Sequence, residues 1–179
     1  MRRLALTALT ASLVLAVPAC GGGSSGQNAV DERRVATLVA DPLLVLVPPG
    51  GSVSSGPAGD TASSDLPWDE GGGRNSAGSV HQLAGTDAES AQFYVDELIE
   101  QGWTAVEAAC THLPDSGRWV VSIGARRWYD GFEGRASVSV EPDGSGSRAL
   151  VAVKAPYHSE DGEQPTPTAP ATDCIDGLG

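Results

Sequence analysis

The feature that most constrains the fold of this chain is one amphipathic helix followed directly by a series of strand patterns. Thr86 and Glu89 have the spacing of a capping box, in which each side chain satisfies a free backbone N–H at the start of a helix. Gly102 lies where a left-handed cap ends a helix. Between them, apolar residues recur three and four positions apart, as on one face of a helix: Ala91, Tyr94, Val95, Leu98 and Ile99. The sequence therefore predicts a helix over residues 87–101.

Segments of strand-like composition follow this helix. They cover residues 103–110, 118–129, 135–141 and 148–155. The connectors at 130–134 and 142–147 are short and rich in Gly and Asp, which favours hairpins and an antiparallel meander. A shorter strand is expected at 79–83. One main helix on one face of an antiparallel sheet of about four to five strands gives a two-layer α+β domain, which we expect over residues 30–158.

Two stretches lack the composition of a packed core, and a third is ambiguous. Residues 54–77 are rich in Ser, Gly, Pro and Asp and are predicted to be a mobile insertion. In the tail, which we place at 159–179, residues 159–172 turn acidic and then Pro/Thr-rich, which suits an extended segment and also O-glycosylation. In the third stretch, Asp41-Pro42 favours a helix start whereas the valines at 45 and 47 favour a strand, and both alternatives stay open.

The first 19 residues have the pattern of an export signal. Arg2 and Arg3 precede an apolar run, and the small residue Ala19 stands directly before Cys20. The apolar run is too short to span the ~30 Å hydrocarbon layer of a membrane. Residues 1–19 are therefore predicted to be a secretory signal peptide, and the Gly/Ser-rich residues 20–29 a flexible linker.

The segment Val17-Pro18-Ala19-Cys20 resembles the lipobox of bacterial lipoproteins. This resemblance implies that fatty acyl chains such as palmitate are attached at Cys20 and hold the protein at the outer face of the cell membrane, or at an outer membrane in a bacterium that has one. Two or three such chains make the attachment lasting. The alternative is an ordinary signal peptide in which Cys20 is an incidental thiol.

A second pattern, Tyr94-x-x-x-Leu98-x-x-x-Gly102-Trp103, resembles small extracytoplasmic lipoproteins of unknown function. The resemblance covers roughly residues 42–155 and consists mainly of packing positions. It supports the predicted fold and implies no catalytic residues.

Charge argues against two classes of partner. The chain has 11 basic and 23 acidic residues, and removal of Arg2 and Arg3 with the signal peptide leaves a net charge of 9 − 23, or −14. Such a charge repels nucleic acid and anionic lipid head groups, so we predict no binding to either through a basic patch and no nucleic-acid partner.

Cys110 and Cys174 are the two cysteines that remain after Cys20. Outside the cytoplasm thiols oxidise, and an even number of cysteines favours a disulfide. We therefore predict a Cys110–Cys174 bridge that holds the tail to the sheet. The alternative is two independent thiols.

Residues with catalytic or metal-binding chemistry are few and poorly placed. Gly22 to Gly26 match the G-x-S-x-G pattern, but they lie in the linker and not at a strand-to-helix turn. Cys110 and His112 could form a nucleophile and a base, which a disulfide would prevent, and the addition of Asp115 gives no paired metal-ligand spacing. His81 and His158 stand alone. We predict no enzyme activity, metal or cofactor.

The candidate partner-binding residues are Arg126, Arg127, Trp128 and Tyr129. Arg and aromatic side chains are enriched at interfaces. The alternative is a strand that buries its aromatic side chains and exposes its arginines. We expect a lipid-anchored module that binds or scaffolds an envelope protein or glycan, in an oligomeric state that the sequence leaves open. The alternative function is a small envelope hydrolase-like enzyme with a loop-built site.

Overall fold

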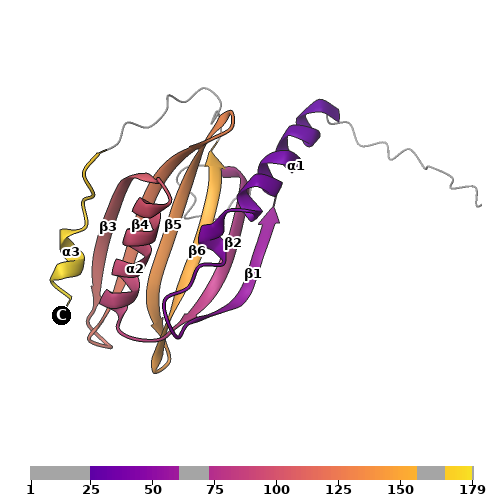
Figure 1. The fold of residues 1–179 in the computed structure, drawn as a ribbon. Coiled ribbons are helices and arrows are strands. Elements are labelled where there is room, and N and C mark those ends of the chain that lie inside the picture. Colours follow the sequence, from indigo (N-terminus) through magenta and orange to yellow (C-terminus); the bar gives the residue numbers. More distant parts are fainter. Residues whose placement is uncertain (1–24, 61–72, 157–167, 179) are drawn as a thin grey trace, which may run out of the picture.

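The computed structural model describes residues 25–60, 73–156 and 168–178 of the 179-residue chain. These residues form an α+β unit with a six-stranded antiparallel sheet in the order β1-β2-β6-β5-β4-β3 (Figure 1). The strands are β1 (Ser52–Asp60), β2 (Gly73–Leu83), β3 (Thr104–Leu113), β4 (Arg118–Tyr129), β5 (Phe132–Asp143) and β6 (Gly146–Pro156). The helices are α1 (Ser25–Val39), the 3-10 turn η1 (Pro42–Leu44), α2 (Asp87–Glu100) and α3 (Asp173–Asp176). The predicted signal peptide and Cys20 lie outside the described residues.

Two layers enclose the core. Helices α1 and α2 lie on the same side of the sheet (Figure 1), with α1 against β1, β2 and β6 and α2 against β3, β4 and β5. Apolar side chains from alternate strand positions point toward these helices, as the two-residue period of a strand requires. They include Val121, Ile123, Val138, Val140, Val151 and Val153, all 2% exposed or less.

Helix α2 confirms the predicted helix almost to the residue. Both halves of the Thr86–Glu89 capping box form, and Gly102 has the expected positive φ of 80°. Four of the five stripe residues are buried: Ala91, Tyr94, Val95 and Leu98. Ile99 remains 45% exposed because it lies at the margin of the stripe.

The antiparallel meander of β4, β5 and β6 is also confirmed. Ile123 pairs with Val138, which pairs with Val151, so that one apolar row crosses all three strands. Alternation of apolar and polar residues fixes this register, because a slip by one residue would turn every apolar side chain to the other face.

The sheet is wider than predicted because part of the expected insertion at 54–77 is strand. Residues 54–60 belong to β1 and residues 73–77 to β2, whereas 61–72 lie outside the described residues. Every side chain of β1 is exposed, so this edge strand carries no apolar alternation. A Cβ at Gly59 would lie 2.5 Å from Val35 and 2.6 Å from Val39 of α1. The small residues that suggested a loop therefore allow α1 to approach the sheet.

The N-terminal elements differ from the prediction in two ways. Helix α1 is a second helix that covers the sheet, and it begins at Ser25, inside the predicted linker 20–29. Asp41 does cap a turn, since its Oδ1 accepts the Leu43 N–H at 2.9 Å, but that turn is the short η1. Val45 and Val47 are in neither a helix nor a strand.

The C-terminal residues 168–178 pack against β3. Cys110 and Cys174 form the predicted disulfide, with Cα atoms 5.9 Å apart. Ala171 exchanges two backbone hydrogen bonds of 2.9 Å with the edge of β3, and Ile175 is only 4% exposed. The remaining tail residues, 157–167 and 179, lie outside the described residues.

Candidate functional site

The face of the sheet that points away from α1 and α2 is a candidate binding surface, and we call it the open face. No described helix lies against it (Figure 1). Its side chains are mostly small or polar, as on a sheet face that meets water. On the adjacent strands β4 and β5 this face includes Ser122, Gly124, Arg126 and Trp128, and Glu133, Arg135, Ser137 and Ser139.

The four predicted partner-binding residues do not share one surface. Arg126 and Trp128 are on the open face, whereas Arg127 and Tyr129 point toward the helices, because successive side chains of a strand alternate between its faces. Each side of the sheet therefore receives one arginine and one aromatic ring. Neither the predicted cluster nor its alternative describes this arrangement.

Arg126 instead has a neighbour that was not predicted. It pairs directly with Arg135 across β4 and β5. Glu133 lies beside both, with its Oε1 3.0 Å from Nε of Arg135 and 4.0 Å from Nε of Arg126. The two arginine side chains are 53% and 48% exposed, and that of Glu133 is 12% exposed.

The two arginines line a surface pocket of about 430 Å³, which we call the arginine pocket. Its other lining residues include Ala105, Glu107, Gly124 and Thr168. The pocket thus joins the open face to the first described residue of the C-terminal segment, which β3 holds in place. No family model, curated protein or solved structure matches the chain.

Strand β3 is irregular beside the arginine pocket. Its pairing with β4 shifts between Thr104 and Glu107, and Ala105 has a φ of 49°. A left-handed conformation at a residue with a Cβ costs about 1–3 kcal/mol, and such residues gather at functional sites. Bulges also occur preferentially beside binding sites, where they redirect side chains. The irregularity places Glu107 and Ala105 at the rim of the arginine pocket.

On the helix side of β4, Asp41 organises a buried polar cluster. Its carboxylate accepts the Tyr129 hydroxyl at 2.6 Å and lies 3.5 Å from Nη1 of Arg127. The Arg127 guanidinium also stacks on the rings of Trp103 and Tyr129. Burial raises the pKa of Tyr129, and the hydrogen bond to Asp41 raises it further. Tyr129 therefore stays protonated as a donor, and the cluster ties η1 to the sheet.

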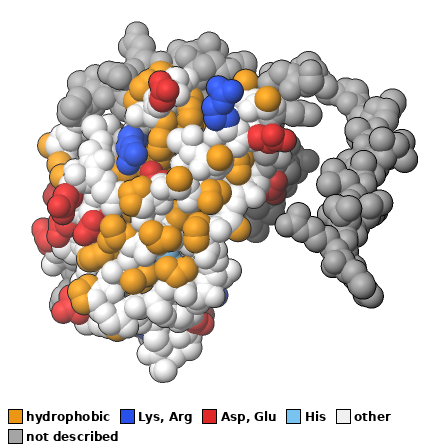
Figure 2. Space-filling view, turned by 45° about the vertical axis from the view of Figure 1, so that its right-hand side comes forward, with side chains coloured by type: hydrophobic (Ala, Val, Ile, Leu, Met, Phe, Trp, Pro, Cys, Tyr) orange, Lys and Arg blue, Asp and Glu red, His pale blue; other side chains and the backbone are white. Residues whose placement is uncertain are grey.

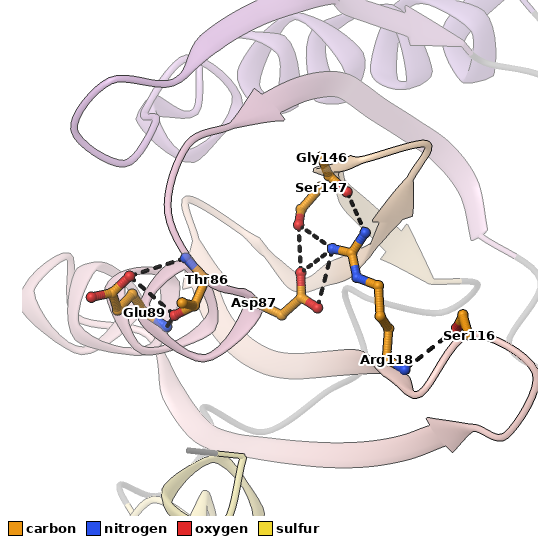
Figure 3. Close-up of polar contacts among 7 residues, drawn as sticks. All are labelled: Thr86, Asp87, Glu89, Ser116, Arg118, Gly146 and Ser147. Atoms are coloured by element: carbon orange, nitrogen blue, oxygen red, sulfur yellow. Dashed lines mark hydrogen bonds and ion pairs between the residues drawn. The ribbon is translucent and has the colours of Figure 1, made fainter.

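A second polar cluster holds the start of α2 against the β5–β6 hairpin (Figure 3). Nη2 of Arg118 donates to Asp87 at 3.0 Å and to Ser147 at 2.7 Å, and Nη1 donates to the Gly146 carbonyl at 2.6 Å. Ser147 donates in turn to Asp87. Figure 3 also shows the adjacent capping box of Thr86. Because its charged groups pair with one another, we assign this cluster a structural role and not a binding role.

His81 is fully buried among three polar partners. Its Nε2 lies 3.0 Å from the Leu44 carbonyl and 2.8 Å from Ser79 Oγ, and its Nδ1 lies 2.7 Å from the Tyr94 hydroxyl. A carbonyl only accepts, so Nε2 must carry the proton and Nδ1 must accept from Tyr94. Nε2 then has no lone pair with which to deprotonate Ser79. This Ser–His pair is therefore not an activated nucleophile.

The burial of His81 predicts a pH-dependent stability. Burial lowers its pKa below the ordinary value, whereas the unfolded chain titrates near pH 6.5. Below about pH 6.5 the unfolded state therefore binds the extra proton, and the free energy of unfolding should fall by up to about 1.4 kcal/mol per pH unit until the folded pKa is reached. Urea unfolding of His81→Gln between pH 5 and about 7 should show lower stability and a flatter slope. Equal slopes in wild type and His81→Gln would contradict this assignment.

The helix side also exposes apolar surface. Figure 2 shows hydrophobic side chains across the middle of this view, with Asp and Glu toward its margins. Val45 is 55% exposed, and a recess of about 330 Å³ lies between Pro48, Pro49 and Phe93. The recess lacks a converging set of charged groups, since Glu89 is its only charged lining residue among those described.

Within the three described ranges, no group of three or more His, Cys, Asp and Glu side chains is arranged to hold a metal ion. None of the helices there is both long enough and apolar enough to cross a membrane.

Proposed function

We propose that this protein is a membrane-anchored module of the cell envelope that binds or scaffolds an envelope component through the open face. The observation that carries the proposal is the open face itself, because both long described helices lie on the other side of the sheet. The open face also holds the exposed Arg126 and Arg135 beside a pocket of about 430 Å³.

The position of α1 supports attachment close to a membrane. Ser25 is the first residue of α1, five residues after Cys20. A chain of five residues spans at most about 18 Å, so a lipid on Cys20 would hold the start of α1 near the head groups. This tether is shorter than the predicted linker of residues 20–29. The partner would therefore be reached within the envelope layer next to the bilayer.

The alternative, a small hydrolase, has less support from the described residues. The nearest approach to a nucleophile and base is Ser79 with His81, and both side chains are buried at 6% and 0% exposure. The proton on Nε2 of His81 also opposes that chemistry. A binding role needs only the exposed side chains that the open face provides.

Position-specific photo-crosslinking in intact cells tests the proposal. A crosslinking amino acid is placed at Ser122 or Ser137, both exposed on the open face, or at Asp96, which is exposed on α2. The two open-face positions should capture the same envelope component, and Asp96 should not, because only the open face contacts the partner. Cys20→Ala should release the protein from membranes and abolish capture.

Two results would contradict the proposal. Equal capture from Asp96 would mean that contact does not depend on the open face. Retention of the Cys20→Ala variant in the membrane fraction would contradict attachment through a lipid on Cys20. A variant with Ser139→Ala, a half-buried open-face residue, is the control for general effects of substitution on this face.

A further inference from the structure

We propose that the arginine pocket binds a phosphate group carried by an uncharged polar unit such as a glycerol or a sugar. The inference rests on the proposed function and gives a ligand chemistry to the open face. It is drawn from the Arg126–Arg135 pair, its incomplete neutralisation by Glu133, and the size and lining of the pocket.

Two arginines directly opposite each other on neighbouring strands are unfavourable for folding alone. Like charges at such positions repel and destabilise the sheet. Glu133 contributes one negative charge against two positive ones and makes its closest approach to Arg135. The pair therefore concentrates positive charge in a chain whose overall net charge is −12, which favours an anionic ligand at this place.

The hydrogen-bonding capacity of the pair fits a phosphate. Arg135 donates to Glu133 through Nε only, and Arg126 donates no side-chain hydrogen bond to a described residue. The terminal amino groups of both guanidinium groups thus remain available as donors. One guanidinium satisfies a planar carboxylate in a bidentate pair, whereas two adjacent guanidinium groups can satisfy the several oxygens of a tetrahedral phosphate.

The rest of the pocket indicates what else the ligand carries. A volume of about 430 Å³ is much larger than one phosphate needs. A Cβ placed on Gly124 would meet no atom within 4 Å, so the floor beside Arg126 is open. Thr168 and Ala105 add a hydroxyl and a methyl group, and the Glu107 carboxylate disfavours an anionic group on its own side of the pocket. These residues suit an uncharged polyol or sugar next to the phosphate.

The test uses the full chain in neutral detergent micelles, so that it does not depend on lipid attachment. Saturation-transfer NMR with glycerol 3-phosphate, competed with inorganic phosphate, gives the affinity. Wild type should bind both, and glycerol alone should not bind. Arg126→Gln/Arg135→Gln should weaken binding at least about tenfold, because it removes the charge-assisted hydrogen bonds.

Three further variants sharpen the test. Arg126→Lys/Arg135→Lys keeps the charge but loses the fork geometry, so its affinity should fall several-fold. Glu133→Gln removes the competing carboxylate and should bind more tightly than wild type. Arg148→Gln is the matched control, since Arg148 is also on the open face but is paired with Glu141 at 2.7 Å, and it should bind like wild type.

To identify the source of the phosphate, the binding of glycerol 3-phosphate is measured in micelles that contain phosphatidylglycerol or the same fraction of phosphatidylcholine. If phosphatidylglycerol alone competes with glycerol 3-phosphate, a lipid head group is the source. If neither competes, the ligand is a soluble or glycan-linked phosphate. Either result supports the phosphate site.

The inference would be overturned if the folded double Gln variant bound as tightly as wild type. It would also be overturned if the folded double Lys variant and the folded double Gln variant had the same affinity as each other. An equal loss in Arg148→Gln would overturn it too. This failure is distinguishable from failure of the proposed function. Crosslinking from Ser122 would persist in the double Gln variant if only the phosphate inference were wrong, whereas it would be absent from wild type if the open face bound no partner.

Discussion

Removal of the Cys110–Cys174 disulfide by the double substitution Cys110→Ala/Cys174→Ala is expected to lower the free energy of unfolding by about 4 kcal/mol. The bridge joins residues 64 positions apart, and in the chain-entropy model a loop of that length strongly restricts the unfolded state. Folded domains are stable by only about 5–15 kcal/mol, so this loss is large. Urea unfolding of wild type and the double variant measures it.

The loss should be accompanied by local opening of the C-terminal segment. Two backbone hydrogen bonds of Ala171 and the buried side chain of Ile175 also hold this segment. Without the bridge, hydrogen exchange at the Ala108 and Ala171 amides should speed up more than exchange in the central strands. A reductant should bring wild type to the behaviour of the double variant and leave that variant unchanged. Stability within about 1 kcal/mol of wild type would show that the bridge constrains little.

The parts of the fold that could be predicted are those in which sequence period and local chemistry agree. Helix α2 has a capping box, an apolar stripe and a positive-φ glycine, all of which the structure confirms. Strand β5 alternates apolar and polar residues, and in β4 and β6 the apolar residues at alternate positions are buried, because one face of the sheet is covered and the other is not. The even number of cysteines after Cys20 was sufficient to predict the disulfide.

The N-terminal part could not be predicted in the same way because tertiary packing determines it. Strand β1 is an edge strand with no buried side chain, so it has no apolar period to detect. Gly59 resembles a loop residue in the sequence, but its missing side chain is what allows Val35 and Val39 to pack on the strand. Composition alone does not distinguish these two uses of glycine.

The arginine pocket was missed for a reason that the hairpin makes clear. The connector between β4 and β5 was predicted as residues 130–134, whereas the structure pairs Tyr129 with Phe132 and leaves only Asp130-Gly131 in the loop. Asp-Gly is a strong signal for a two-residue hairpin loop. Counting back from that loop places Arg126 opposite Arg135, so the pair was within reach of the sequence. The left-handed conformation of Ala105 could not be predicted from the sequence, because no local pattern marks it.

Replacement of Asp41 by Ala is expected to destabilise the fold by about 3 kcal/mol, because one carboxylate has three partners. The substitution removes the cap of Leu43, the acceptor of the buried Tyr129 hydroxyl and the counter-charge of Arg127. The Asp41 side chain is fully buried, whereas that of Arg127 is 28% exposed. Water can therefore partly solvate Arg127 after the substitution, which keeps the cost toward the lower end of the range for a broken buried pair. Urea unfolding measures the change.

Matched variants separate the three contributions of Asp41. Asp41→Asn keeps one oxygen for the Leu43 N–H but loses the charge and one acceptor. It should therefore lower the free energy of unfolding by about 1–2 kcal/mol. Asp130→Ala removes an exposed carboxylate from the neighbouring hairpin and should cost less than about 0.5 kcal/mol. In the double variant Asp41→Asn/Arg127→Met the loss should be smaller than the sum of the two single losses, because neither partner is left with an unpaired charge. If Asp41→Ala instead matched Asp130→Ala, the contacts that tie η1 to β4 would contribute little to stability, and the packing of α1 on β1, β2 and β6 would be enough to hold it in place.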